Sequence, residues 1–387
     1  MRPRVQAEES ERVRLGELFA ELCAIESPFG HERACADRVA AELRGLGLTV
    51  EEDGAGALLG ATAGNLLARV PSRAEIAGAP EAPSVLLCAH LDTVPLTDRV
   101  EPVLVDEGWE NAHAAILGAD NKAAVAVMLA VARRLVAAPA EIAVELLFTV
   151  CEENALAGAK VFDVSRLRSA FGYVFDHATP IGEVIVASPT YHRIVADFRG
   201  VEAHAGIKPE EGRSAILAAA RAVSAMPLGR LDDETTANVG LVSGGSGVNV
   251  VPGACRIEAE ARSLDETKVE AVVAEIVDHL HDGANAAECD VDVTVECLFR
   301  GYRLKPSAAH VAAAESALHA CGYVPKRIAS GGGSDANAFI AAGFPCVNLA
   351  NGTERAHQPD ERVSVVALEG MLDVALTLVA ESAEVLC

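Results

Sequence analysis

The segment VLLCAHLDTVP, residues 85–95, is an apolar run that stops abruptly at His90 and Asp92. Its first part, residues 85–89, is typical of a strand buried on both faces, as in α/β proteins. A long alanine-rich stretch at 121–136 predicts a helix, and the next apolar run, at 142–150, predicts another buried strand. This alternation predicts an α/β domain whose mostly parallel sheet is covered by helices.

Working outward, the pattern changes between residues 188 and 300. There the predicted elements follow the order βαββαβ, with strands at 192–199, 237–242, 255–262 and 291–298 and helices at 213–225 and 266–281. That order is the one found in ferredoxin-like α+β domains. After residue 303 the helix and strand pattern of the first part returns. We therefore predict a main domain formed by residues 1–187 and 301–387, with residues 188–300 inserted into it.

The composition sets limits on the function. The chain has 387 residues, 51% of them hydrophobic, which suffices for two buried cores rather than one. Its 32 basic and 56 acidic residues give a net charge of −24, which disfavours nucleic acid and anionic membrane as partners. The amino-terminal stretch lacks the continuous apolar segment of a secretory signal, and the apolar run at 123–132 is too short to cross a bilayer.

Cysteine usage agrees with a soluble, cytoplasmic protein. The chain has 10 cysteines without CxxC pairs, and several lie in apolar strand-like runs, where a small hydrophobic side chain fits. We interpret them as buried, reduced thiols. Cys88 and Cys151 flank the polar positions described next, so a catalytic thiol is an alternative, but nothing in the sequence marks either of them as activated.

Residue types that ligate metals recur where the predicted strands end. They are His90 in AHLDTVP, Asp120 in GADNKA, Glu153 in CEEN, Asp176 in VFDHA and His357 in ERAHQPD. Two imidazoles and three carboxylates can hold two adjacent divalent cations if one carboxylate bridges them. The set therefore predicts a two-metal hydrolase.

Each position also has an ordinary explanation. Asp120 precedes a helix and could simply be its N-cap. Asp92 lies two residues after His90 on the same side of a strand, so that it can reach the ring nitrogen not used for a metal. Glu152 and Glu153 follow a buried strand directly, where two carboxylates are costly unless they face cations. We expect one of this pair to bind metal and the other to act as general base.

Taken together, HLDTVP, GADNKA, the paired glutamates, the strand-ending Asp176 and the late His357 resemble the signature of the zinc aminoacylase, carboxypeptidase G and peptidase T superfamily. The likeness runs over nearly the whole chain. Three more segments resemble peptidase T-like proteins in particular: SPFGHE at 27–32, HAGIKPEEGRSAI at 204–216 and SGGGSDANAF at 330–339.

The resemblance implies a role for each ligand. His90 and Asp176 would hold one zinc ion, Glu153 and His357 the other, and Asp120 would bridge the two. Cobalt or manganese would also suit such ligands. Asp92 would orient His90. Glu152 would be the base that deprotonates a water and returns the proton to the leaving amine.

The resemblance also implies roles for residues of the inserted domain. His204 would reach into the partner subunit's site and help to stabilise the oxyanion, so that the domain would act as lid and homodimer contact. Arg262 matches an arginine that binds the terminal carboxylate of a substrate, and Asn249 lies in a matching polar loop. The glycine-rich loop with Gly332 and Ser334 lacks the ending of a P-loop, and we expect it to touch the substrate backbone instead.

The function expected from these observations is hydrolysis of short peptides, as by a tripeptide aminopeptidase. An alternative keeps the metals but acts on N-acyl or N-carbamoyl amino acids. A third hypothesis is a peptide-binding homologue without catalysis. Such a protein would be expected to lose the base or a ligand, and none is missing.

Overall fold

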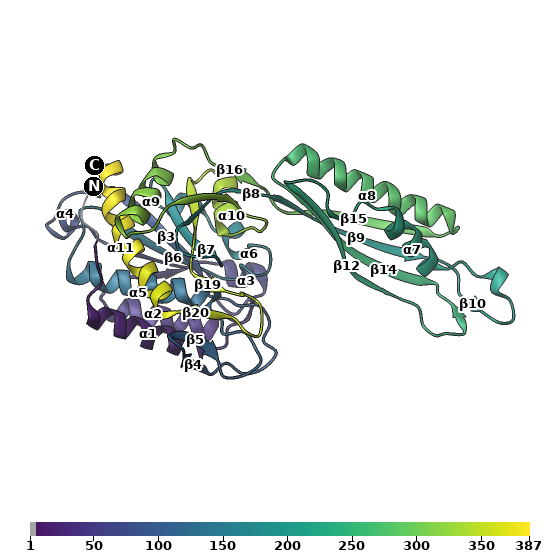
Figure 1. The fold of residues 1–387 in the computed structure, drawn as a ribbon, viewed down its shortest axis with the longest axis horizontal. Helices are drawn as coiled ribbons and strands as arrows, with labels where there is room; N and C mark the ends of the chain where they lie inside the picture. Colours follow the sequence, from purple (N-terminus) through teal and green to yellow (C-terminus); the bar gives the residue numbers. More distant parts are fainter. Residues whose placement is uncertain (1–4) are drawn as a thin grey trace. The chain divides into compact units, whose positions relative to one another are not determined.

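The computed structural model describes residues 5–387. The chain divides into two compact units, Met1–Val186 with Leu304–Cys387, and Ala187–Arg303. Each unit has its own cluster of buried apolar side chains. Figure 1 shows the second unit as the teal and green middle of the chain.

The first unit is built on a large sheet. In the described part of the chain its strands follow the spatial order β1 (Val50–Glu52), β2 (Leu66–Val70), β6 (Ala143–Thr149), β3 (Ser84–His90), β7 (Gly172–His177), β18 (Cys346–Ala350), β8 (Glu183–Ser188) and β16 (Tyr302–Arg303), and β17 (Lys326–Ala329) pairs with β8. Strands β3 and β6 are buried along their whole length, as expected for strands covered on both faces.

The α/β class is confirmed, but the sheet is mixed rather than mostly parallel. The central strands β6, β3, β7 and β18 run parallel to one another. On the outer side of β6 the sheet continues with β2 and β1, and on the outer side of β18 it continues with β8 and β16. All of these outer pairs are antiparallel. The prediction failed at the edges because strand direction there depends on chain connections that local hydrophobicity does not encode.

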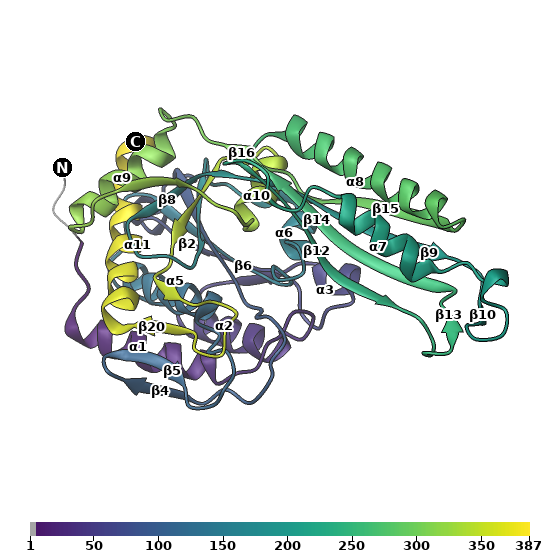
Figure 2. The same ribbon diagram turned by 45° about the vertical axis from the view of Figure 1, so that its right-hand side comes forward.

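Helices cover both faces of this sheet, as Figures 1 and 2 show. The long helix α5 (Ala119–Ala137) packs on β3 and β7, and it contacts α1 (Glu9–Cys23), α2 (Arg33–Gly45) and α11 (Val365–Leu386). Helix α9 (Ala309–Ala320) packs on α11 and β18. Helix α10 (Asp335–Ala341) packs on β7 and β18 together with α6 (Ala157–Val161), which contacts α3 (Ala55–Leu59). Helix α5 is buried almost all around, so its apolar composition follows from its central place.

A small antiparallel sheet, not predicted from the sequence, also belongs to the first unit. It has the order β19 (Thr353–Glu354), β20 (Arg362–Ser364), β5 (Gly108–Asn111) and β4 (Pro102–Val105). Strand β20 pairs with β5, which brings the segment before α5 next to the segment before α11. The loop between β19 and β20 carries His357. Two further short helices are α4 (Arg73–Ile76) and the 3-10 turn η1 (Val164–Arg166).

The second unit has the element order expected from the sequence: β9 (Thr190–Arg199), α7 (Ala215–Ala225), β12 (Thr235–Gly244), β14 (Ala254–Ser263), α8 (Glu266–Ala286) and β15 (Asp290–Phe299). In space the strands follow the order β12-β14-β9-β15, all antiparallel, with the short β11 (Gly229–Arg230) beside β12. Burial alternates along β14, because α7 and α8 cover only one face of the sheet.

A second small pairing extends this unit. Strand β10 (Ala203–His204) pairs with β13 (Val250–Val251), and the 3-10 turn η2 (Pro209–Glu211) follows β10. None of the helices described between residues 5 and 387 combines the length and the apolar character that a bilayer crossing requires.

Candidate active site

Three adjacent parallel strands deliver polar side chains to one edge of the large sheet. His90 is the last residue of β3, Asp176 is the next-to-last residue of β7, and the Glu152–Glu153 pair follows the end of β6. Since β6, β3 and β7 are neighbours and run in the same direction, their carboxyl ends meet at the same edge. This is where α/β sheets place their ligands.

Asp120 lies between two groups of side chains. On one side, Nε2 of His90 lies 3.6 Å from Oδ1 of Asp120 and 3.4 Å from Oδ1 of Asp176. On the other side, Nε2 of His357 lies 3.6 Å from Oδ2 of Asp120 and 2.8 Å from Oε1 of Glu153. In both groups the candidate ligand atoms all lie within 4.8 Å of one another. Each oxygen of Asp120 therefore faces a different histidine, as a bridging ligand requires.

The donor set fits divalent cations. The side chains of Asp120, Glu153 and Asp176 are largely buried, and Oδ1 of Asp120 has no hydrogen-bond partner among the described residues. Buried carboxylates in such number are unfavourable unless positive charge compensates them. Imidazole nitrogens and carboxylate oxygens at this spacing are the ligands that zinc and similar ions prefer. The residues present thus fit the binding of divalent cations.

The electrostatics of the cluster agree with this assignment. Hydrogen bonds to Asp120 and Glu153 raise the pKa of His357 to about 10. Burial and the charge of Asp176 raise the pKa of Glu152 well above its ordinary value. Burial likewise raises the pKa of Glu153 and that of Asp176. Protons and metal cations therefore compete for these side chains, because either can neutralise the negative charge of the clustered carboxylates.

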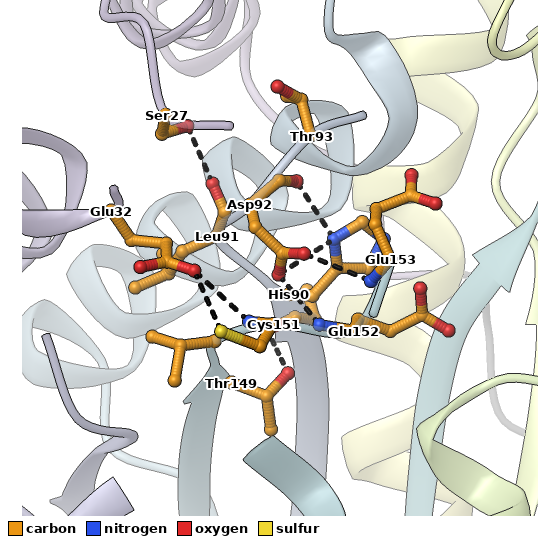
Figure 3. A network of polar contacts seen from close by, with 12 residues as sticks. Ser27, Glu32, His90, Leu91, Asp92, Thr93, Thr149, Cys151, Glu152 and Glu153 are labelled. Atoms are coloured by element: carbon orange, nitrogen blue, oxygen red, sulfur yellow. Dashed lines mark hydrogen bonds and ion pairs between the residues drawn. The ribbon is translucent and has the colours of Figure 1, made fainter. Parts of the chain in front are cut away.

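Glu152 lies beside the ligands without being tied to another side chain. It forms a candidate group with His90 and Glu153, whose ligand atoms lie within 4.8 Å of one another. Among the described residues, no hydrogen bond or ion pair holds its carboxylate, and Figure 3 shows it pointing away from Glu32 and Cys151. A carboxylate that is near the cluster and uncommitted suits a general base.

Asp92 holds the turn that carries both glutamates. Its Oδ1 accepts a hydrogen bond from the backbone N–H of Glu152 and its Oδ2 one from that of Glu153, each at 3.0 Å (Figure 3). The contact with His90 differs from the expected one. Nδ1 of His90 lies 3.0 Å from the backbone oxygen of Asp92 and 3.6 Å from its carboxylate. The ring is thus oriented mainly by a carbonyl group.

Glu32 holds the preceding residue of the same turn. Its Oε1 accepts hydrogen bonds from the backbone N–H of Cys151, at 3.2 Å, and from that of Gly30, at 2.6 Å. Glu32 is fully buried, and Cys151 has a left-handed backbone, with φ 54. Two buried carboxylates, Glu32 and Asp92, therefore fix three consecutive amides (Figure 3). In the sequence, Glu32 stands out only as the last residue of the SPFGHE motif.

Asp335 is a second buried acid near the ligand cluster that no sequence pattern singles out. It is buried beneath the strand ends and accepts a hydrogen bond from Oγ1 of Thr149, the residue paired with His90 across β6 and β3. Burial raises its pKa to about 7. Asp335 lies in the glycine-rich motif, but one sequence does not reveal which acid of a motif is buried.

The remaining predicted residues lie outside the ligand cluster. Gly332 and Ser334 are in the loop between β17 and α10, where Ser334 is the buried N-cap residue and Gly332 keeps some exposed surface. His204, Asn249 and Arg262 belong to the second unit. His204 and Asn249 lie together, since the N–H of Ala205 donates to the carbonyl of Asn249 at 2.9 Å. Their roles at the site remain predictions.

Comparison with known proteins agrees with this geometry. Residues 86–381 match the model of peptidase family M20/M25/M40. The chain belongs to this family. An uncharacterized Bacillus subtilis protein, YqjE, is 35% identical over 372 residues, which cover 96% of this chain and 99% of that protein. The resemblance inferred from the motifs is thereby confirmed.

Two solved structures of this M20-type fold are similar over nearly the full length. An aminopeptidase PepT from Bacillus cereus has a TM-score of 0.85 and 36% identity, and a tripeptidase from Staphylococcus aureus has a TM-score of 0.89 and 34% identity. Each match covers 96% of this chain and 99% of the other. The M20 family membership and the ligand cluster together make this chain a metal-dependent peptidase.

Proposed function

We propose that the protein is an aminopeptidase that releases the amino-terminal residue of short peptides, tripeptides foremost, with two divalent cations, zinc in the native enzyme. The observation that carries this proposal is the position of Asp120, whose two oxygens face His90 and His357 at 3.6 Å each. The full-length similarity to an aminopeptidase and to a tripeptidase supports the substrate class.

In this proposal the protein residues divide the chemistry among them. His90 and Asp176 would hold one cation, Glu153 and His357 would hold the other, and Asp120 would contribute to both positions. Cations bound there would supply Lewis acidity and would favour the ionisation of water at neutral pH. Glu152 accepts the proton of the attacking water and returns it to the leaving amine. Its raised pKa suits a group that must hold that proton between the two events.

Arg262 is a suitable ligand for the carboxylate end of the peptide. Its guanidinium lies 4.1 Å from the ring centroid of Tyr191 and 2.9 Å from Oε2 of Glu260. Stacking on an aromatic ring and an ion pair limit the freedom of this side chain. A guanidinium held in this way can form a bidentate pair with a terminal carboxylate. Gly332, with its partly exposed backbone, would contact the peptide chain beside Ser334.

The second unit supports a homodimer in which His204 acts on the partner's site. The register of β14 places Ala254 opposite Arg199 and Arg262 opposite Tyr191. His204 and Asn249 are attached to the Ala254 end, so Arg262 lies roughly 25 Å away, at about 3.4 Å for each strand residue. A tripeptide spans only about 11 Å, so we propose that the two ends of this sheet serve different active sites. One site can use both ends if two chains contribute.

The outer edge of β12 offers a surface for such a dimer. Within residues 5–387, only β11 pairs with this edge, at Thr236 and Ala237. Farther along it, Leu241 is 63% exposed and Val242 59%. An exposed apolar edge strand is a template for pairing with another strand. We propose that a second copy covers it.

We also propose a cytosolic location. Among the described residues, none of the 10 cysteines is assigned to a disulfide bond, and eight of them are buried. Cysteines without disulfide bonds, in this number, are typical of a protein from a reducing compartment. Fractionation of the source cells tests this, and recovery of the protein outside the cytosolic fraction would contradict it.

A deacylase that acts on N-acyl or N-carbamoyl amino acids would use the same ligands. The two functions differ at the amino end of the substrate, where a peptidase accepts a free amine. Initial rates of the zinc-loaded enzyme on a tripeptide panel and on matched acylated amino acids test the proposal. We expect faster turnover of the tripeptides. Turnover of acylated amino acids alone would establish the alternative.

A further inference from the structure

Glu361 joins the two loops that carry Asp120 and His357. Its Oε2 accepts a hydrogen bond from the N–H of Gly118 at 2.7 Å, and its Oε1 one from the N–H of Asp120 at 2.9 Å. The side chain is 1% exposed, and it lies four residues after His357. Both of its oxygens are therefore used on the loop that carries the bridging ligand.

Helix α5 lacks a local cap at this end. Its N-cap residue is Gly118, which has no side chain, and Asp120 and Asn121 have backbone angles outside the helical range. A serine or asparagine at the cap would satisfy these N–H groups locally. Here a buried carboxylate from a loop distant in sequence does so, although burying it is unfavourable without those bonds. Capping the helix would not by itself require a residue from a distant loop.

His357 needs support from its loop. Its side chain is 49% exposed, and the loop includes left-handed residues at Arg355 and His357, with φ 53 and 64. Burial therefore does not hold the ring in place. Glu361 is the buried residue that anchors the same loop, and what it binds is the backbone of Asp120. Its two bonds therefore tie the loop of His357 to the backbone of the segment that carries Asp120.

We propose that Glu361 is a positioning residue that holds Asp120 and His357 together and thereby sets the affinity of the second metal position, formed by Asp120, Glu153 and His357. The first position, formed by His90, Asp120 and Asp176, has only one ligand, Asp120, on a loop that Glu361 binds. This inference rests on the proposed two-metal site. It adds that the two positions depend unequally on one residue that touches neither metal nor substrate.

The test is a titration of metal-free protein with Co²⁺. Binding is measured by calorimetry and by the visible spectrum of the bound ion. Glu361→Gln places an NH₂ group against one backbone N–H and so removes one of the two bonds. We expect the second equivalent to bind about tenfold more weakly or worse, and the first to change little. Glu361→Asp keeps the charge with a shorter reach and should give an intermediate affinity. Glu381→Gln, at a buried acid on α11, is the matched control.

The first equivalent reports whether each variant is folded. If the parent protein binds two equivalents and Glu361→Gln binds both unchanged, the inference is wrong while the proposed function stands. If both equivalents weaken together, Glu361 has a general structural role and the inference is also wrong. If the parent protein itself fails to bind two equivalents, the proposed two-metal function is the part that fails.

Discussion

The carboxylate of Asp92 binds the backbone N–H of Glu152 at 3.0 Å, and so it fixes the main chain of this residue while leaving its carboxylate free. The proposed base thus has a rigid backbone and an uncommitted side chain. The same carboxylate binds the N–H of Glu153, so base and ligand share one support.

Replacing Glu152 by Gln should abolish turnover and spare the metals. Glutamine has nearly the same shape but cannot accept the proton of water, and loss of a general base costs at least about a hundredfold in rate. Initial rates on a tripeptide, together with metal analysis of the same sample, check this. Activity within a few-fold of the parent would show that another group is the base.

Metal uptake should release protons. In the metal-free protein the pKa of His357 is raised to about 10, so its ring is charged at neutral pH, whereas a ligating imidazole must be neutral. The apparent affinity should therefore fall as the pH is lowered from 9 toward 6. Calorimetry in buffers of different ionisation enthalpy counts the protons, and His113→Ala, outside the cluster, is the control. An affinity independent of pH would contradict the assignment of His357.

Glu32 should matter for stability through one oxygen only. Its Oε1 bonds the N–H groups of Gly30 and Cys151, whereas Oε2 has no partner among the described residues. Glu32→Ala leaves two N–H groups unpaired and should cost about 3 kcal/mol in free energy of unfolding. Glu32→Gln keeps the acceptor and should cost much less. Denaturant unfolding of the metal-free variants checks this, and equal stability would show that the bonds are unimportant.

The proposed action of His204 across a dimer predicts complementation. His204→Ala and Glu152→Gln should each be inactive alone. In a mixed dimer, the Glu152→Gln subunit supplies His204 to the intact base of the other, so an equal mixture should recover up to about a quarter of the parent activity. The measurement is activity after subunit exchange. Recovery would not occur if His204 serves its own chain.

The sequence predicts the centre of the fold better than its margins. Strands β3 and β6 and helix α5 are found because continuous apolar runs end at clear turns. Helix α1 was not predicted, because its apolar residues alternate with many charges. The antiparallel edges of the sheet could not be predicted either, since the direction of pairing is a property of the whole chain.

The site shows the same division. His90, Glu153 and Asp176 could be predicted because strand ends converge in α/β sheets. Glu32 and Glu361 could not, because each looks like an ordinary surface acid in the sequence. Their function depends on burial against backbone amides that come from distant segments.

The central claim is that two cations and the groups around Asp120 carry out peptide hydrolysis. The most direct test is to titrate metal-free protein with Zn²⁺ while following release of the amino-terminal residue from a tripeptide. We expect no release without metal and a rate that reaches its plateau at two equivalents per chain. Full activity in the metal-free protein, or no activity with both equivalents bound, would contradict the claim.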